Sequence, residues 1–201
     1  MRLGFGVLLA LMVSGTWSQP AQPPQKDPQS AVEPRSGPGA GQEFLKRMVG
    51  EWEVVKRFHP RTGEPVEAKG ECKQSMMHEN RFLKSEFVFT QGNTRTTGLG
   101  IIGFEPQTGL FTSVWTDSRA TRMSFRKSQE KFNGKEIVLF SQTLEGPGGE
   151  NRRSRTVTML EDGDKKLVHR QFNQNPDGSE RVMMELLMTR KATTVSTPEG
   201  K

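Results

Sequence analysis

The chain has little cysteine and few aromatic residues. Its 201 residues include one Cys, no Tyr and three Trp. A single Cys excludes an internal disulfide and a zinc site built from several thiolates. The formal net charge is +6, but the basic residues show no interleaved aromatic stripe of the kind that binds nucleic acid. We therefore expect no metal site, no resident cofactor and no nucleic-acid partner.

Apolar residues are also scarce, at 32% of the chain. Even when the 21 Gly are added, the total stays slightly below the ~45–50% that is usual for soluble domains. Part of the interior is therefore expected to be small or polar. The length suits one domain with short appendages, which excludes a large two-domain enzyme.

Long apolar runs are limited to the start of the sequence. Arg2 precedes an apolar run of eleven residues, Leu3–Val13, and small residues occupy both cleavage positions, Thr16 and Ser18. A helix of that length spans about 16 Å, too short for the ~30 Å hydrocarbon core of a bilayer. The pattern predicts a signal peptide at residues 1–18, cut after Ser18. The protein would then be secreted or periplasmic, with no membrane span after cleavage.

Composition divides the remaining chain into three segments. Residues 19–41 contain six of the twelve Pro and no apolar periodicity, which predicts a disordered spacer. Residues 192–201 are small and polar, which predicts a disordered tail. The folded domain is therefore expected at residues 42–191.

Within that domain the apolar pattern is helical only once, at residues 43–49, where Phe44, Leu45 and Met48 share one face. From Glu51 onward, polar and apolar residues alternate, and turn sequences recur about every ten residues. This pattern predicts an all-β fold, an antiparallel up-and-down barrel of about ten strands with one short N-terminal helix. The expected strands are 52–58, 66–76, 82–89, 95–104, 111–116, 122–127, 137–144, 155–160, 167–172 and 182–190.

The segment 66–76 shows the alternation most clearly. Its even positions are mostly small or apolar, whereas its odd positions carry charges or Ser. Cys72 is an even position, so we expect its thiol to point inward. No base is evident beside it, which favours a buried core cysteine over a catalytic nucleophile.

A barrel of this size often encloses a ligand cavity. Trp52 and Lys56 share one strand face, and Trp115 and Asp117 share another. A charged side chain inside a barrel lowers the stability of the fold by roughly several kcal/mol unless it is paired or hydrated. Asp117 therefore either forms a structural ion pair or lines a wet pocket that orients the polar end of a ligand. The candidate ligand-binding residues are Trp52, Phe87, Phe89 and Trp115 as walls, and Lys56, Asp117 and Arg155 as polar anchors.

Three further features have plain structural explanations. Residues 98–103 match the spacing of the dinucleotide fingerprint, but a turn follows them instead of a helix, so strand bending or close backbone approach explains these glycines better. His169 lies in a strand and is the histidine that could face the interior as a haem or metal ligand, but a single histidine without supporting spacing is usually structural or exposed. The basic series Arg119, Arg122 and Arg126 is expected to form a solvated turn and strand face.

Several short segments, taken together in their order along the chain, resemble those of a known family. They are residues 43–53 (EFLKRMVGEWE), 81–83 (RFL), 98–105 (GLGIIGFE), 115–118 (WTDS) and 176–178 (PDG), the last leading into Met184-Glu185 and Thr189-Arg190. Together they resemble the bacterial family called domain of unknown function 1579, over about residues 42–191. The resemblance implies a calycin-like barrel, related in architecture to lipocalins, fatty-acid-binding proteins and nitrobindins, and it implies no established activity. Haem-binding relatives carry a Gly-x-Trp-x-Gly-x-Gly opening, whereas here Trp52 is followed by Glu53-Val54-Val55-Lys56, which disfavours haem.

Two classes of function remain, besides a filled barrel with a structural or interaction role. The first is a binding module that holds a small apolar or amphipathic ligand. The second is a haem-binding or weakly enzymatic barrel, with Asp117 as acid or base and His169 as ligand. The sequence shows no arrangement of nucleophile, base and orienting group, so we favour the binding module over an enzyme.

Overall fold

The computed structural model describes residues 37–141, 154–175 and 177–192. The expected signal peptide at 1–18 lies outside the described residues, as do the spacer up to residue 36 and the tail from residue 193. Within the described ranges, no helix has the length and apolar character needed to cross a bilayer.

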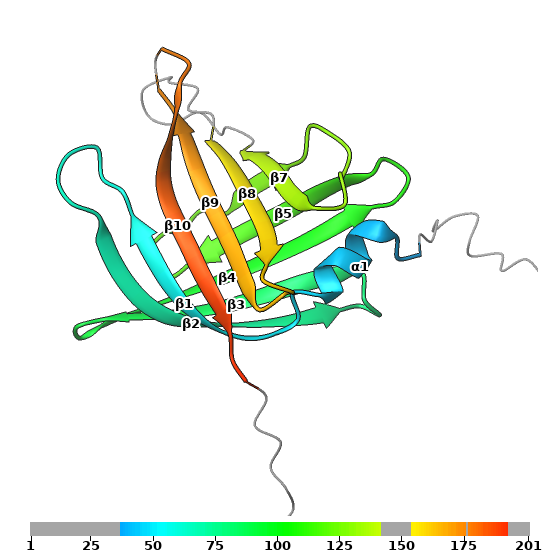
Figure 1. Cartoon of the computed structure of the whole chain (residues 1–201), viewed down its shortest axis with the longest axis horizontal. Coiled ribbons are helices and arrows are strands. Elements are labelled where there is room, and N and C mark those ends of the chain that lie inside the picture. The colour runs from blue at the N-terminus through cyan, green and yellow to red at the C-terminus, as the bar shows by residue number, and fades with distance from the viewer. Residues whose placement is uncertain (1–36, 142–153, 176, 193–201) are drawn as a thin grey trace, which may run out of the picture. The chain divides into compact units, whose positions relative to one another are not determined.

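The described residues form one short helix and ten strands that close into a barrel. The helix α1 spans Ala40–Lys46, and the strands are β1 Gly50–Phe58, β2 Val66–Met77, β3 Phe82–Gln91, β4 Thr94–Glu105, β5 Leu110–Asp117, β6 Ser124–Lys127, β7 Glu136–Ser141, β8 Ser154–Glu161, β9 Lys166–Gln174 and β10 Glu180–Arg190. Each strand pairs antiparallel with the next along the chain, and β10 pairs with β1 to close the sheet (Figure 1). The predicted antiparallel up-and-down β-barrel of ten strands is confirmed.

The alternation predicted for β2 sets which of its faces is inside the barrel. Cys72 is 2% exposed, whereas its neighbours Glu71 and Lys73 are exposed. In the sheet, Cys72 lies opposite Trp52 of β1 and Phe87 of β3. The thiol therefore packs in the core, and burial raises its pKa, as expected for a structural cysteine.

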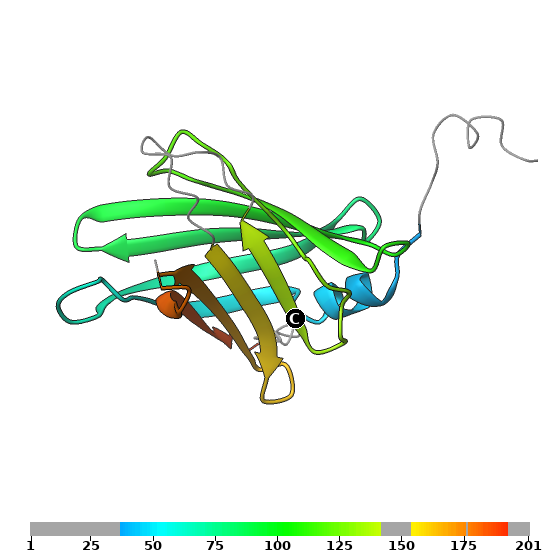
Figure 2. The same ribbon diagram turned by 90° about the horizontal axis from the view of Figure 1, so that it is seen from above.

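α1 covers one end of the barrel in both views (Figures 1 and 2). It begins at Ala40, before the predicted start at residue 43, because Gln42 supports its first turn. The Gly39 amide donates to Gln42 Oε1 at 2.7 Å, and Gln42 Nε2 donates to the Phe104 carbonyl oxygen of β4 at 2.7 Å. Gly41 lies so close to the Phe104 ring that a Cβ on it would be 2.2 Å from a ring carbon, so this contact requires glycine.

Apolar side chains of α1 and of the residues just after it fill that end of the barrel. Phe44, Leu45 and Met48 are at most 4% exposed. The Phe44 ring packs edge-on against Phe132, with 5.1 Å between centroids. They join one core cluster with inward-facing strand residues, among them Trp52, Leu83, Phe111, Ile137, Leu167 and Met188.

Trp52 and Arg190 fasten the closure between β1 and β10 at the same end. Trp52 is fully buried and donates from Nε1 to the Met48 carbonyl oxygen at 3.0 Å. The Arg190 guanidinium lies 4.1 Å from the Trp52 ring and donates to the carbonyl oxygens of Arg47, Val49 and Asp164 at 2.6, 2.6 and 2.9 Å. One arginine therefore ties together the residues after α1, the turn before β9 and the end of β10.

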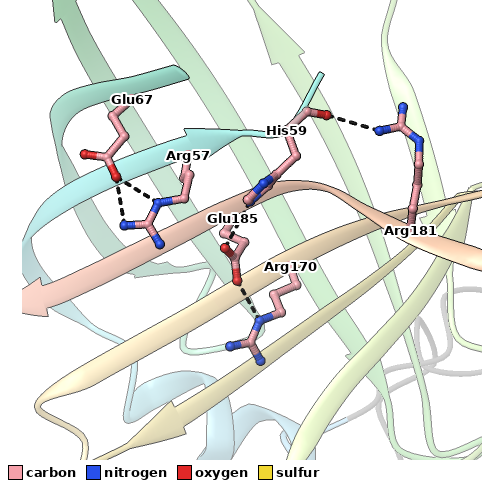
Figure 3. Close-up of polar contacts among 6 residues, drawn as sticks. All are labelled: Arg57, His59, Glu67, Arg170, Arg181 and Glu185. Carbon is pink, nitrogen blue, oxygen red and sulfur yellow. Dashed lines mark hydrogen bonds and ion pairs between the residues drawn. The ribbon is translucent and has the colours of Figure 1, made fainter. Parts of the chain in front are cut away.

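The outer face of β1, β9 and β10 is charged, as the alternation predicts. Glu185 of β10 accepts a hydrogen bond from Arg170 Nε at 2.9 Å, and its other oxygen lies 3.2 Å from His59 Nε2 (Figure 3). The hydrogen bond from Arg170, and to a smaller extent the contact with His59, lower the pKa of Glu185. Arg57 and Glu67 form a further ion pair on this face (Figure 3).

Candidate functional site

The barrel encloses a cavity of about 360 Å³ that is lined by side chains from all ten strands. Its apolar floor consists of Met48, Leu83, Ile137, Leu167 and Met188, which also belong to the core cluster around α1. The helix end of the barrel is therefore packed, and the cavity lies above it. This volume is within the ~300–1,000 Å³ typical of small-molecule sites.

Three aromatic rings form one side of the cavity, which we call the aromatic wall: Phe87, Phe89 and Trp115. The Phe87 and Phe89 rings are stacked with 5.9 Å between centroids, and Trp115 packs edge-on against Phe87 at 5.5 Å. Gly98 of β4 makes room for the indole, because a Cβ there would lie 2.5 Å from the Trp115 ring. The glycine spacing at 98–103 therefore serves close packing, as the sequence analysis favoured over a phosphate site.

An ion pair lies beside the aromatic wall. Asp117 accepts hydrogen bonds from Trp115 Nε1 at 3.0 Å and from Arg119 Nη2 at 2.8 Å, and its second oxygen accepts from the Arg119 amide at 2.9 Å. These contacts, above all the Arg119 side chain, hold the pKa of Asp117 well below its usual range. Asp117 is therefore an ionised carboxylate with both oxygens occupied, which does not favour a role as a catalytic acid.

Lys56 reaches the cavity from β1. Its Nζ lies 4.6 Å from the centroid of the Phe89 ring, a cation–π contact. Burial lowers the pKa of Lys56, because the low-dielectric surroundings disfavour the charged form. The nearby charge of Arg119 lowers it further, and that of Asp117 acts in the opposite direction.

Two basic side chains, Arg126 of β6 and His169 of β9, line the cavity between these features and the floor, and we call them the basic pair. Arg126 Nε is buried and has no hydrogen-bond partner within the described part of the chain. His169 Nδ1 lies 2.8 Å from Thr158 Oγ1, which leaves Nε2 as its other polar atom. Burial, and secondarily the charge of Arg126, lower the pKa of His169 to about 4, so this imidazole is neutral at pH 7.

A buried amide adds to the polar part of the cavity. Gln74 of β2 donates from Nε2 to Ser85 Oγ of β3 at 2.9 Å, while Gln74 Oε1 is buried without a partner among the described residues. Both residues are at most 9% exposed and line the cavity. The interior is thus partly small and polar, as the low apolar content of the sequence predicted.

The structure brings five of the seven candidate residues to the cavity: Lys56, Phe87, Phe89, Trp115 and Asp117. Trp52 lies below the cavity in the core cluster, under α1. Arg155 is on the outer face of β8, because its neighbour Thr156 faces inward. There Arg155 pairs with Glu180 at 2.6 Å and lies 4.3 Å from the Phe172 ring, so it does not line the cavity.

The sequence predicts a solvated face for Arg126, and this prediction is wrong, because the structure places Arg126 in the cavity lining. Within 124–127 the alternation favours Phe125 as the inward residue, yet Phe125 is 49% exposed and Arg126 points inward. The reason is pairing: Ser113 of β5 lies opposite Arg126, and Ser113 shares the inward face of β5 with Trp115. His169 faces the interior and lines the cavity, and among the described residues no hydrogen bond joins it to Asp117.

No group of three or more His, Cys, Asp or Glu side chains in the described ranges is placed to hold a metal ion. The polar chemistry of the cavity is instead that of hydrogen-bond donors and positive charge. The lining polar groups include Lys56, Arg119, Arg126, His169, Gln74 and Thr158. Such a set can orient a ligand but provides no activated nucleophile.

Comparisons with known proteins agree with this architecture. The crystal structure of Rv2717c from M. tuberculosis superposes with a TM-score of 0.56 at 12% identity, covering 78% of this chain and 100% of that one. The S-type phycobiliprotein lyase CpeS from Guillardia theta superposes with a TM-score of 0.50 at 12% identity, covering 82% and 98%. No curated protein sequence matches significantly. The family model described as "Protein of unknown function (DUF1579)" matches residues 37–190. The chain therefore belongs to this family and folds as a calycin-like β-barrel.

Proposed function

We propose that the barrel is a binding module that holds a small apolar or amphipathic molecule in its interior. The observation that carries the proposal is the cavity of about 360 Å³, whose lining combines an aromatic wall with buried polar groups. A site that is mostly apolar with a few placed polar groups is the usual form of a small-molecule pocket.

The unpartnered polar atoms in the cavity support a ligand over a filled structural barrel. A buried donor or acceptor left without a partner costs about 1–3 kcal/mol, and the cavity contains Arg126 Nε and Gln74 Oε1 in that state. A barrel selected only for stability gains nothing from these atoms. An occupant with polar atoms of its own would satisfy them.

A neutral fluorescent dye, N-phenyl-1-naphthylamine, tests the proposal on the full chain. Its emission rises when it enters an apolar site, so titration of the protein into the dye gives a dissociation constant. We expect saturable binding by the wild-type chain. Ser113→Phe places a ring in the cavity from β5 and should weaken dye binding about tenfold or more, because it occupies part of the volume.

Thr112→Phe is the matched control, because Thr112 is the exposed neighbour of Ser113 on the same strand. It should leave dye binding unchanged. Equal dye binding by both variants would place the dye on the outer surface and contradict the proposal, as would the absence of saturable binding by the wild-type chain. Circular dichroism of each variant establishes that it is folded.

We also propose that the protein works outside the cytoplasm. The apolar run Leu3–Val13 and the small residues before Gln19 support a cleavable signal at 1–18, and the buried position of Cys72 suits an oxidising compartment. Intact-mass measurement of the protein made by its native host tests this. We expect the mass of a chain that starts at Gln19, and the mass of a chain that starts at Met1 would contradict the proposal.

A further inference from the structure

The charges that line the cavity do not balance. The cationic side chains are Lys56, Arg119 and Arg126, and among the described residues of the lining Asp117 is the one carboxylate. Arg119 occupies both oxygens of Asp117. Lys56 and Arg126 are therefore left without a carboxylate of their own on the cavity wall.

Arg126 is the more informative of these two cations. Lys56 lies against the face of Phe89 and near Asp117, which both stabilise its charge. Among the described residues Arg126 has neither: its Nε is buried without a partner, and no acidic group there offsets the burial that disfavours its charge. A guanidinium stays charged in proteins, so the described part of the barrel leaves this cation uncompensated.

Within the described ranges, the neighbours of Arg126 on the cavity wall are hydrogen-bonding groups with no negative charge. Ser113 lies opposite it on β5 and Ser141 on β7. His169 is near enough for the two basic groups to influence each other, and its Nδ1 contact with Thr158 fixes the ring orientation. If the Thr158 hydroxyl donates to Nδ1, the neutral ring carries its proton on Nε2 and can itself donate.

We propose that the natural occupant is an amphipathic organic anion whose carboxylate is bound by Arg126 and His169, with its apolar part against the aromatic wall. This inference rests on the proposed function, since it names the class of ligand for the same cavity. A guanidinium matches a carboxylate in geometry as well as in charge, because its N–H groups form a planar fork. An anion in this place compensates a partly buried cation that has no carboxylate partner among the described residues.

Decanoate and 1-decanol are the probes that separate charge from apolar contact. Both have a ten-carbon chain and differ in the head group, and both are tested at pH 7.5 by displacement of N-phenyl-1-naphthylamine from the full chain. Decanoate should bind the wild-type protein at least about tenfold more tightly than decanol, as expected for a charge-assisted hydrogen bond in a buried site.

Arg126→Met tests the assigned residue. It should weaken decanoate binding about tenfold or more and leave decanol binding unchanged, so that the preference for the acid disappears. It should also raise the melting temperature of the ligand-free protein, because an apolar side chain replaces an unpaired buried cation. The variant thus separates a binding role from a structural one.

Arg170→Met is the matched control. Arg170 lies on the outer face, paired with Glu185 (Figure 3), so its loss changes the net charge equally without altering the cavity. It should preserve the preference for decanoate.

Equal binding of decanoate and decanol by the wild-type chain would overturn the inference. If the dye still binds in that case, the proposed function stands. A preference for decanoate that survives Arg126→Met would equally overturn the inference. If the dye, the acid and the alcohol all fail to bind, the proposed function itself is wrong and the inference falls with it.

Discussion

His169 should make the stability of the barrel fall as the pH drops below about 6.5. Its pKa lies at about 4 in the folded protein, against 6.5 for an unperturbed histidine, because burial and the charge of Arg126 disfavour the imidazolium. Since the folded pKa is the lower one, the unfolded chain binds more protons between these values. Stability is therefore full above about pH 6.5 and is lost as the pH falls towards 4.

The size of the effect follows from the shift. At 1.36 kcal/mol per pKa unit, the difference corresponds to about 3 kcal/mol in total, of which about 2 kcal/mol is lost between pH 7.5 and 5. For a domain of this size, that is about 4–8 °C in melting temperature. Asp117, Asp164, Glu180 and Glu185 have lowered pKa values, so their contributions are lost only below about pH 4.5.

Thermal unfolding followed by circular dichroism at pH 7.5 and 5 measures this loss. His169→Asn keeps a polar group near Thr158 but cannot titrate, so it should remove most of the pH dependence. His78→Asn is the matched control, because His78 is exposed in a turn, and it should retain the wild-type dependence. If the melting temperature of His169→Asn falls between pH 7.5 and 5 as much as that of the wild type, the reasoning is refuted. That result would show that burial does not hold the imidazole neutral.

Two further predictions concern the core. Arg190→Met removes a guanidinium that stacks on Trp52 and donates to three carbonyl oxygens. Because two of these hydrogen bonds are exposed, we expect the free energy of unfolding to fall by about 2–3 kcal/mol, or the melting temperature by about 4–12 °C. An unchanged melting temperature would contradict the role of Arg190 in closing the barrel. Cys72 is 2% exposed and its thiol pKa is raised by burial, so a disulfide reagent should modify it only as fast as the chain unfolds; rapid modification of the native protein would show that the thiol is accessible.

The fold was predictable from sequence because its signals are local. The alternation in β2, with Cys72 on the inward face, and the recurring turn sequences specify antiparallel strands without knowledge of distant residues. The start of α1 was less predictable, since it depends on Gln42 reaching the carbonyl oxygen of Phe104 in β4. That contact is known only once the barrel is assembled.

The site was predictable in part, for the same reason. Lys56, Trp115 and Asp117 lie on faces that their own long strands determine, whereas β6 has four residues, too few for an alternation to be decisive. Its inward face is set by pairing with β5, which turns Arg126 inward and Phe125 outward. Trp52 was expected in the cavity wall and instead lies beneath it, because α1 packs over that end.

Native mass spectrometry of the protein purified from its own host tests whether the barrel carries an amphipathic carboxylic acid. We expect a mass that exceeds that of the polypeptide by one small molecule, which collisional activation releases and which proves to be such an acid. The Ser113→Phe variant should carry much less of it. A wild-type barrel that has the mass of the polypeptide alone, and that also fails to take up dye or decanoate, would contradict the account.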